Sequence, residues 1–166
     1  MSYVDAPRSH AAVADAAVSA ALLAFAAGAI HLVVGEPHLG TEPAFGLALV
    51  ASGVLQLAWG AAVLKWPSRG VVLAGLGVNA LALLAYAVSR SVGLPIGPDP
   101  GVPGGIGALD TAVVIDEALL VLLSARYFRL RPARADWHAG GLLIRAAGIA
   151  AAISALLVVA GAGHAH

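Results

Sequence analysis

The chain has 166 residues, of which 60% are hydrophobic and only 11% are charged, and its formal net charge is zero. Soluble domains average about 25% charged residues, so this composition excludes an ordinary water-soluble fold and favours a membrane protein. A neutral chain gives no reason to expect a nucleic-acid partner. The absence of cysteine excludes disulfides, thiolate metal sites and iron–sulfur clusters.

Five apolar segments are each long enough to cross a bilayer, which takes about 20 mostly apolar residues. They cover residues of about 13–35, 44–64, 70–92, 107–127 and 141–163. Each segment is continuously apolar, without the alternation of a barrel strand. We therefore predict a single all-α domain, a bundle of five transmembrane helices, and interpret the first segment as a retained span and not as a cleaved signal peptide.

Glycine and proline mark the predicted ends of the helices. Gly35 and Pro37 are expected to end the first helix, and Pro43 to begin the second. Residues 93–107, between the third and fourth helices, are rich in both residue types and predict a non-helical loop. Small residues such as Gly28 and Gly53 indicate close packing of the helices, within one chain or between copies in a homo-oligomer.

Lysine and arginine are distributed unevenly among the connections. Lys65 and Arg69 border the second connection, and four arginines lie in or beside the fourth, at positions 126, 129, 131 and 134. Cytoplasmic loops carry the excess of basic residues, so the second and fourth connections are predicted to be cytoplasmic. The N-terminus is then cytoplasmic and the C-terminus extracytoplasmic.

This orientation gathers imidazole and carboxylate groups towards the extracytoplasmic end. They are His31, Glu36, His38, Asp110, Asp116, Glu117, His164 and His166. Such ligands suit copper or zinc, ahead of iron or manganese, although no H-E-x-x-H spacing is present. We hypothesise a transition-metal site with His31 and Glu117 as inner ligands, used in metal handling or in an accessory or redox subunit of a membrane complex. Haem is disfavoured, because only His31 lies firmly within a helix.

Asp116 and Glu117 also support a different hypothesis. A charge at mid-helix costs roughly 2.5–3.5 kcal/mol on insertion scales, so such residues usually pair, neutralise or serve function. Arg90 is expected to pair with one of them. Alternatively, both carboxylates titrate in a proton- or ion-coupled transporter component, with Gln56 and Asn79 lining the path.

Purely structural interpretations of the same residues stay open at this point. Gln56 and Asn79 could only form hydrogen bonds between helices. His31 could be a neutral histidine bonded to a backbone carbonyl. The chain would then be a structural membrane subunit without chemistry.

Two short stretches are similar to known sequences: A-G-A-I-H-L-V-V, which contains His31, and S-R-S-V-G-L-P-I-G-P, which begins at Ser89. They resemble small multi-pass bacterial membrane proteins that combine such a histidine with an S-R-x-x-G-L-P-x-G-P loop. The resemblance covers about half of the chain. It implies a helical membrane protein, for which we expect a bacterial cytoplasmic membrane, and it implies that His31 and the Arg90–Pro98 loop belong together. It implies no activity.

Overall fold

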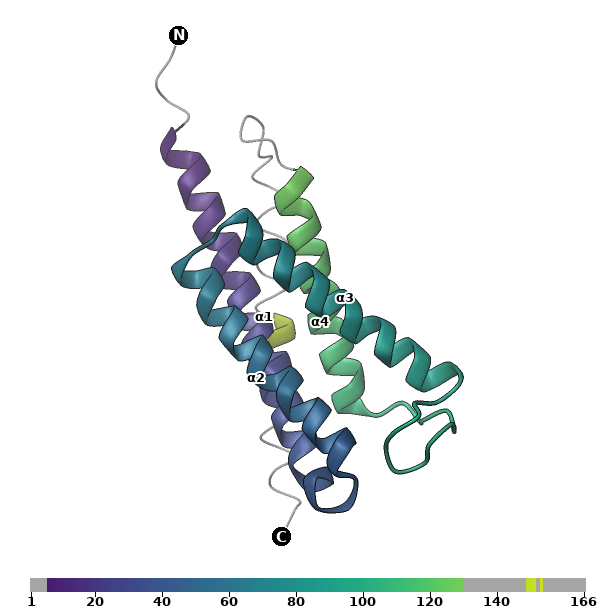
Figure 1. Ribbon diagram of the computed structural model, residues 1–166. Helices are drawn as coiled ribbons and strands as arrows, with labels where there is room; N and C mark the ends of the chain where they lie inside the picture. The colour runs from purple at the N-terminus through teal and green to yellow at the C-terminus, as the bar shows by residue number, and fades with distance from the viewer. Residues whose placement is uncertain (1–5, 130–148, 152, 154–166) are drawn as a thin grey trace.

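The computed structural model describes residues 6–129, 149–151 and 153, with side chains from residue 15 to 125 in the first range. Four long helices follow one another (Figure 1): α1 (Ala6–Thr41), α2 (Pro43–Lys65), α3 (Arg69–Ser91) and α4 (Ala108–Arg129). Residues 149–151 and 153 are also helical. The other residues of the predicted fifth span lie outside the described part, which is all-helical as predicted.

Among the described residues, three helical segments are long and apolar enough to cross a membrane: Asp15–Thr41, Pro43–Lys65 and Arg69–Ser91. They identify the chain as an integral membrane protein. The fourth helix matches the predicted segment in position and has 22 residues. It differs from the other three because it carries three carboxylates, Asp110, Asp116 and Glu117, along its length.

The first helix is longer than predicted. Gly35 and Pro37 do not end it, because α1 continues through Pro37 to Thr41. Proline is tolerated inside a membrane helix where neighbouring groups satisfy the backbone. The chain turns instead at Glu42, whose backbone N–H donates to the carbonyl of His38 at 2.8 Å.

Glycine allows α1 and α2 to form a close hairpin. A Cβ on Gly53 would lie 2.8 Å from the carbonyl oxygen of Gly28, and a Cβ on Gly28 would lie 3.0 Å from that of Gly53. Neither position therefore has room for a side chain. Small residues at facing positions bring helix backbones together in membranes, which is the packing that the sequence indicated.

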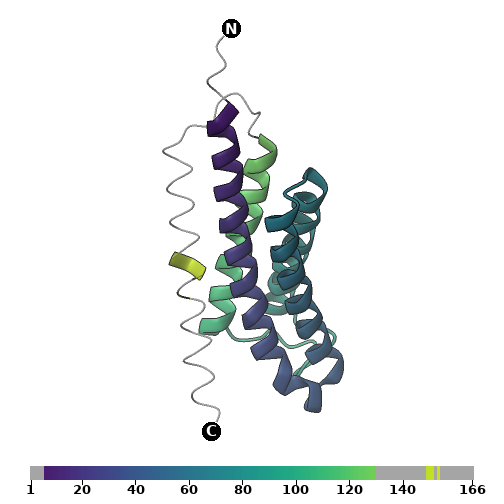
Figure 2. The same cartoon turned by 90° about the vertical axis from the view of Figure 1, so that its left-hand side faces the viewer.

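The helices alternate in direction, so the connections fall at two ends of the bundle (Figure 1). The α1–α2 turn and the α3–α4 loop share one end, where a Cβ on Gly97 would lie 3.6 Å from the Phe45 ring. The α2–α3 turn lies at the other end. Figure 2 shows α1 and α4 side by side, and these two helices pack directly.

The apolar core lies between the middle of the bundle and the α2–α3 turn. Leu23, Ala24 and Leu120 are 0% exposed, and Val63 and Val72 pack with them. Each residue comes from the inner face of its helix, so all four helices contribute to this one core. The centre of the bundle, by contrast, is polar.

Candidate functional site

Each of the four helices contributes one polar side chain to a buried cluster: His31 from α1, Gln56 from α2, Asn79 from α3 and Glu117 from α4. Gln56, Asn79 and Glu117 are at most 2% exposed. The side chain of His31 is 13% exposed. Buried polar groups inside a membrane protein are costly and are usually functional, so we regard this four-helix cluster as the candidate site.

Gln56 is the centre of the cluster. Its Nε2 donates to Glu117 Oε1 at 3.0 Å and also lies 3.3 Å from Asn79 Oδ1. Asn79 is held in turn by its own helix, because its Nδ2 donates to the carbonyl of Gly75 at 2.8 Å. The amide of Gln56 therefore joins α2 to both α3 and α4.

His31 faces Glu117 with one ring nitrogen. Its Nδ1 lies 3.0 Å from the carbonyl oxygen of Ala27, one turn earlier, so Nδ1–H donates to that carbonyl. A neutral ring then carries its lone pair on Nε2, which lies 4.0 Å from Glu117 Oε1. That distance is too long for a direct hydrogen bond, but a small side-chain movement would close it.

The two mid-helix carboxylates are both buried. Asp116 is 0% exposed and Glu117 is 2% exposed, although they point about 100° apart on the helix. Of the two, Glu117 joins the cluster. The sequence identified both as residues that need an explanation, and the structure provides the hydrogen-bond partner Gln56 for Glu117.

Arg90 does not form the expected ion pair with either of these carboxylates. Its Nη2 lies 2.6 Å from Oδ2 of Asp110, in the first turn of α4. Asp110 Oδ2 also accepts the backbone N–H of Gly107 at 3.1 Å. Asp110 lies at the same end of the bundle as Arg90, whereas Glu117 lies two turns deeper, about 10 Å along α4. The side chain of Arg90 therefore contacts Asp110 and not Glu117.

The same arginine closes the α3–α4 loop. Its guanidinium stacks on the Tyr86 ring at 4.9 Å. A Cβ on Gly104 would overlap the guanidinium, and the N–H of Gly104 donates to the carbonyl of Ser89 at 3.0 Å. Gly93 has φ +79°, a conformation that favours glycine. Arg90 therefore fixes both ends of the loop to the bundle.

His38 belongs to the α1–α2 turn and not to the buried cluster. Its Nδ1 lies 2.7 Å from Glu42 Oε2. The helix end predicted at Gly35 and Pro37 would have allowed the chain to turn there and bring His38 back over His31. Because α1 is continuous, the seven residues between the two histidines separate them by about 10 Å along the axis.

The pKa of Glu42, at the turn between α1 and α2, is lowered from its ordinary value. The Thr41 hydroxyl donates to Glu42 Oε2 at 2.5 Å, and His38 contacts the same oxygen. The hydrogen bond from Thr41 is the main cause that lowers the pKa of Glu42, and the bond from His38 is the second.

Of the predicted metal ligands, His31 and Glu117 are close enough to share one ion. His164 and His166 lie outside the described residues. In the part that the structure describes, no three side chains of histidine, aspartate or glutamate converge on one point. Glu36 is exposed on α1.

The sequence identified all four members of the cluster but divided them between two hypotheses, with His31 and Glu117 in the metal site and Gln56 and Asn79 beside Glu117 in the transport path. A usable signal exists: Gln56 lies nine residues before Lys65, and Asn79 lies ten residues after Arg69. Two helices joined by a tight turn place residues at equal distances from that turn at the same depth. Equal depth is what allows the two amides to meet.

Comparisons of the chain with protein-family models, with curated proteins and with solved structures found no match.

Proposed function

We propose that the chain is a proton- or ion-coupled component of a transport system in a bacterial cytoplasmic membrane, in which Glu117 and His31 take up and pass on a proton. One observation carries the proposal. Glu117 is buried among apolar helices, its hydrogen-bond donor is the neutral amide of Gln56, and the lone-pair nitrogen of His31 lies 4.0 Å away.

The cluster supports proton transfer chemically. When the carboxyl of Glu117 is protonated, closing the 4.0 Å gap to about 2.8 Å forms an O–H···N hydrogen bond to His31 Nε2. Transfer breaks the O–H bond and forms an N–H bond, which leaves a carboxylate beside an imidazolium. Gln56 then stabilises the carboxylate by its N–H donor, and Asn79 holds Gln56 in place.

Asp116 gives the proposal its second carboxylate. It is fully buried next to Glu117 on α4. Two adjacent buried carboxyl groups disfavour a doubly charged state. Uptake of a proton or another cation at Glu117 therefore changes the charge that α4 carries within the bundle, and that change can be coupled to a movement of the helix.

The test measures proton flux in sealed vesicles that contain the purified protein and an internal pH dye. A pH gradient is imposed with a potassium potential to balance the charge. We expect flux in the wild type and its loss in Glu117→Gln, which keeps size and hydrogen bonding but cannot titrate. Glu36→Gln is the matched control, because Glu36 is exposed on α1, and it should behave as the wild type. Wild-type vesicles no more permeable than empty ones would overturn the proposal.

A second candidate, the transition-metal site, is supported by the same distance. The 4.0 Å between His31 Nε2 and Glu117 Oε1 is close to the sum of two ligand bonds of about 2.0–2.2 Å each. Oε1 of Gln56 is buried and has no hydrogen-bond partner among the described residues. It offers a third donor for copper or zinc, ahead of iron or manganese.

Metal analysis of the purified protein separates the two candidates. A metal site predicts stoichiometric metal in the wild type and in His38→Ala, and its loss in His31→Ala. His38→Ala is the control because His38 lies at the α1–α2 turn. Proton flux without bound metal supports the first proposal. If neither proton flux nor bound metal is detected, the structural role remains, in which the cluster only joins the four helices.

A further inference from the structure

The two directions that lead out of the four-helix cluster differ in their chemistry. Towards the α2–α3 turn, the next inward-facing residues are apolar and packed. Leu120, three residues after Glu117, and Ala24, seven residues before His31, are both 0% exposed. Val63 and Val72 complete this layer from the other two helices. The described residues of this layer are apolar and closely packed, and such a layer lacks the polar groups that proton conduction requires.

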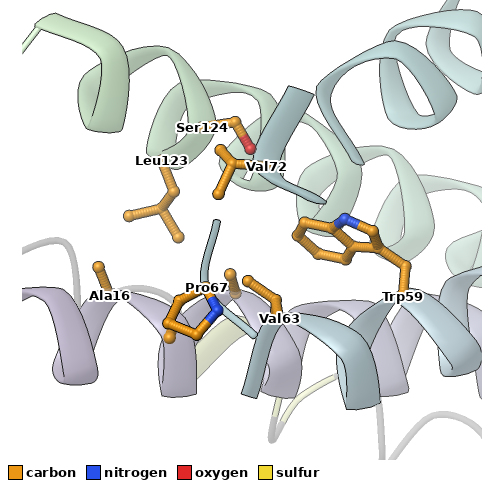
Figure 3. A pocket seen from close by; sticks show the side chains of 9 residues that line it. Ala16, Trp59, Val63, Pro67, Val72, Leu123 and Ser124 are labelled. Carbon is orange, nitrogen blue, oxygen red and sulfur yellow. The ribbon is translucent and has the colours of Figure 1, made fainter. Parts of the chain in front are cut away.

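A small cavity lies beyond this layer and does not reach the cluster. Its volume is about 30 Å³, and Figure 3 shows Trp59, Pro67, Leu123 and Ser124 in its lining. None of the four cluster residues lines it. Ser124 follows Glu117 by seven residues, about 10 Å along α4, with Leu120 between them. The cavity therefore ends on the far side of the apolar layer.

Towards the opposite end, polar groups recur on two helices. On α1, His38 follows His31 by seven residues and is paired with Glu42, each side chain being 27% exposed. On α4, Asp110 precedes Glu117 by seven residues, and its side chain is 34% exposed in the pair with Arg90. Titratable groups that water can reach thus lie two turns from the cluster on both sides of the α1–α4 interface.

We propose that Glu117 exchanges protons with one side of the membrane only, by way of the polar groups at the end formed by the α1–α2 turn and the α3–α4 loop, while the apolar layer around Leu120 separates it from the other side. The distribution of basic residues predicts that this end lies on the extracytoplasmic side. This inference rests on the proposed function, since access from one side is what a coupled transporter requires. Its evidence is the apolar layer on one side of the cluster and the polar pairs on the other.

Because the chain contains no cysteine, single thiols can report access to water. Val114 lies three residues before Glu117 and Leu120 lies three residues after it, so Val114→Cys and Leu120→Cys form a matched pair. Val114 is partly exposed, whereas Leu120 is 0% exposed. Both variants, reconstituted into vesicles, are treated with a small, charged, membrane-impermeant methanethiosulfonate, which reacts with thiols only where water is present.

We expect Val114→Cys to react at least about tenfold faster than Leu120→Cys. Complete labelling of both thiols after denaturation in detergent confirms that each is chemically competent. Ala24→Cys repeats the test of the sealed side from α1 if Leu120→Cys folds poorly, and it should be as unreactive. Equal rates on the two sides, faster reaction at Leu120→Cys, or no reaction at Val114→Cys would each overturn the inference.

The thiol readout does not depend on proton flux. Loss of the flux difference between wild type and Glu117→Gln would remove the proposed function and leave the measured access pattern in place. Equal thiol rates with intact flux would remove the sidedness and leave the proton chemistry of Glu117 and His31 in place.

Discussion

Gln56 Nε2 lies 3.0 Å from Glu117 Oε1, although 61 residues separate the two in the chain. The backbones of α2 and α4 are not in contact, so this amide is a direct link between them. The same nitrogen lies 3.3 Å from Asn79 Oδ1. One side chain thereby sets the position of the buried carboxylate relative to two other helices.

Replacing Gln56 by leucine is expected to destabilise the bundle. Gln56→Leu removes the donor to Glu117 and Asn79, and hydrogen bonds between membrane helices contribute about 1 kcal/mol. Unfolding in mixed micelles, followed by circular dichroism, measures the loss. The control is Ser52→Ala on the same helix, whose hydroxyl bonds only to its own helix at Ala48, and it should change stability little. Equal stability of Gln56→Leu and wild type would contradict the assignment of Gln56 as a link.

A methyl group at the α1–α2 contact should also be destabilising. In Gly53→Ala the new Cβ would lie 2.8 Å from the carbonyl oxygen of Gly28, and overpacking of this kind costs about 1–3 kcal/mol. Gly77→Ala is the matched control, because nothing lies within 4 Å of a Cβ there. It should leave stability unchanged or raise it, since alanine favours a helix more than glycine does. Similar melting temperatures for both variants would count against the close hairpin.

The pair between Arg90 and Asp110 is expected to show a measurable coupling. Both side chains are partly exposed, so we expect a coupling energy of about 1 kcal/mol from a cycle of Arg90→Ala, Asp110→Ala and the double variant. The coupling should weaken at high salt. The corresponding cycle between Arg90 and Glu117 should give no coupling. A larger coupling there would restore the ion pair that the sequence suggested.

The pKa of Glu42 should rise when Thr41 is replaced by valine. The hydroxyl of Thr41 is the largest cause of the lowered pKa, and Thr41→Val removes it while His38 remains. A group with a lowered pKa in the folded state stabilises the fold above its ordinary pKa, and this contribution disappears as pH falls below the ordinary value and through the lowered one. Carbon NMR of the labelled carboxyl follows the titration. Thr111→Val, whose hydroxyl bonds only to the Gly107 carbonyl, is the control and should leave Glu42 unchanged.

The sequence predicted the helices well because a bilayer demands long apolar segments, and α2 and α3 begin and end within two residues of the predicted positions. The predicted end of the first helix at Pro37 was wrong, since proline is a weaker helix breaker in a membrane than the rule for soluble proteins suggests.

The predicted partner of Arg90 was also wrong. Two carboxylates at mid-helix seemed to need a cation, but they lie too deep for Arg90, whereas Asp110 lies at the right depth.

Residue types alone identified His31, Gln56, Asn79 and Glu117 as unusual in an apolar chain. Their convergence depends on the rotation and depth of four helices, which no local pattern encodes. The error with the largest effect on the predicted site was the end of α1. Because α1 continues to Thr41, His38 lies at the α1–α2 turn and not in the site that the sequence predicted. The pairs set by one turn or one helix, such as His38 with Glu42, follow from spacing once the turn is known.

The length of α1 gives the lipid a role in this protein. Its 36 residues make a rod of about 54 Å, whereas the 23 residues of α2 make about 35 Å, close to the hydrocarbon thickness of about 30 Å. Because the Thr41 end joins α2, the surplus of about 20 Å falls at the Ala6 end, and Figure 2 shows α1 reaching beyond the α2–α3 turn. Most of this surplus lies before the candidate span, which begins at Asp15, so it extends beyond the hydrocarbon and does not add to a mismatch. The span itself has 27 residues and a length of about 40 Å, and a span longer than the hydrocarbon relieves the mismatch by tilting. Membrane thickness would then set the inclination of the helix that carries His31.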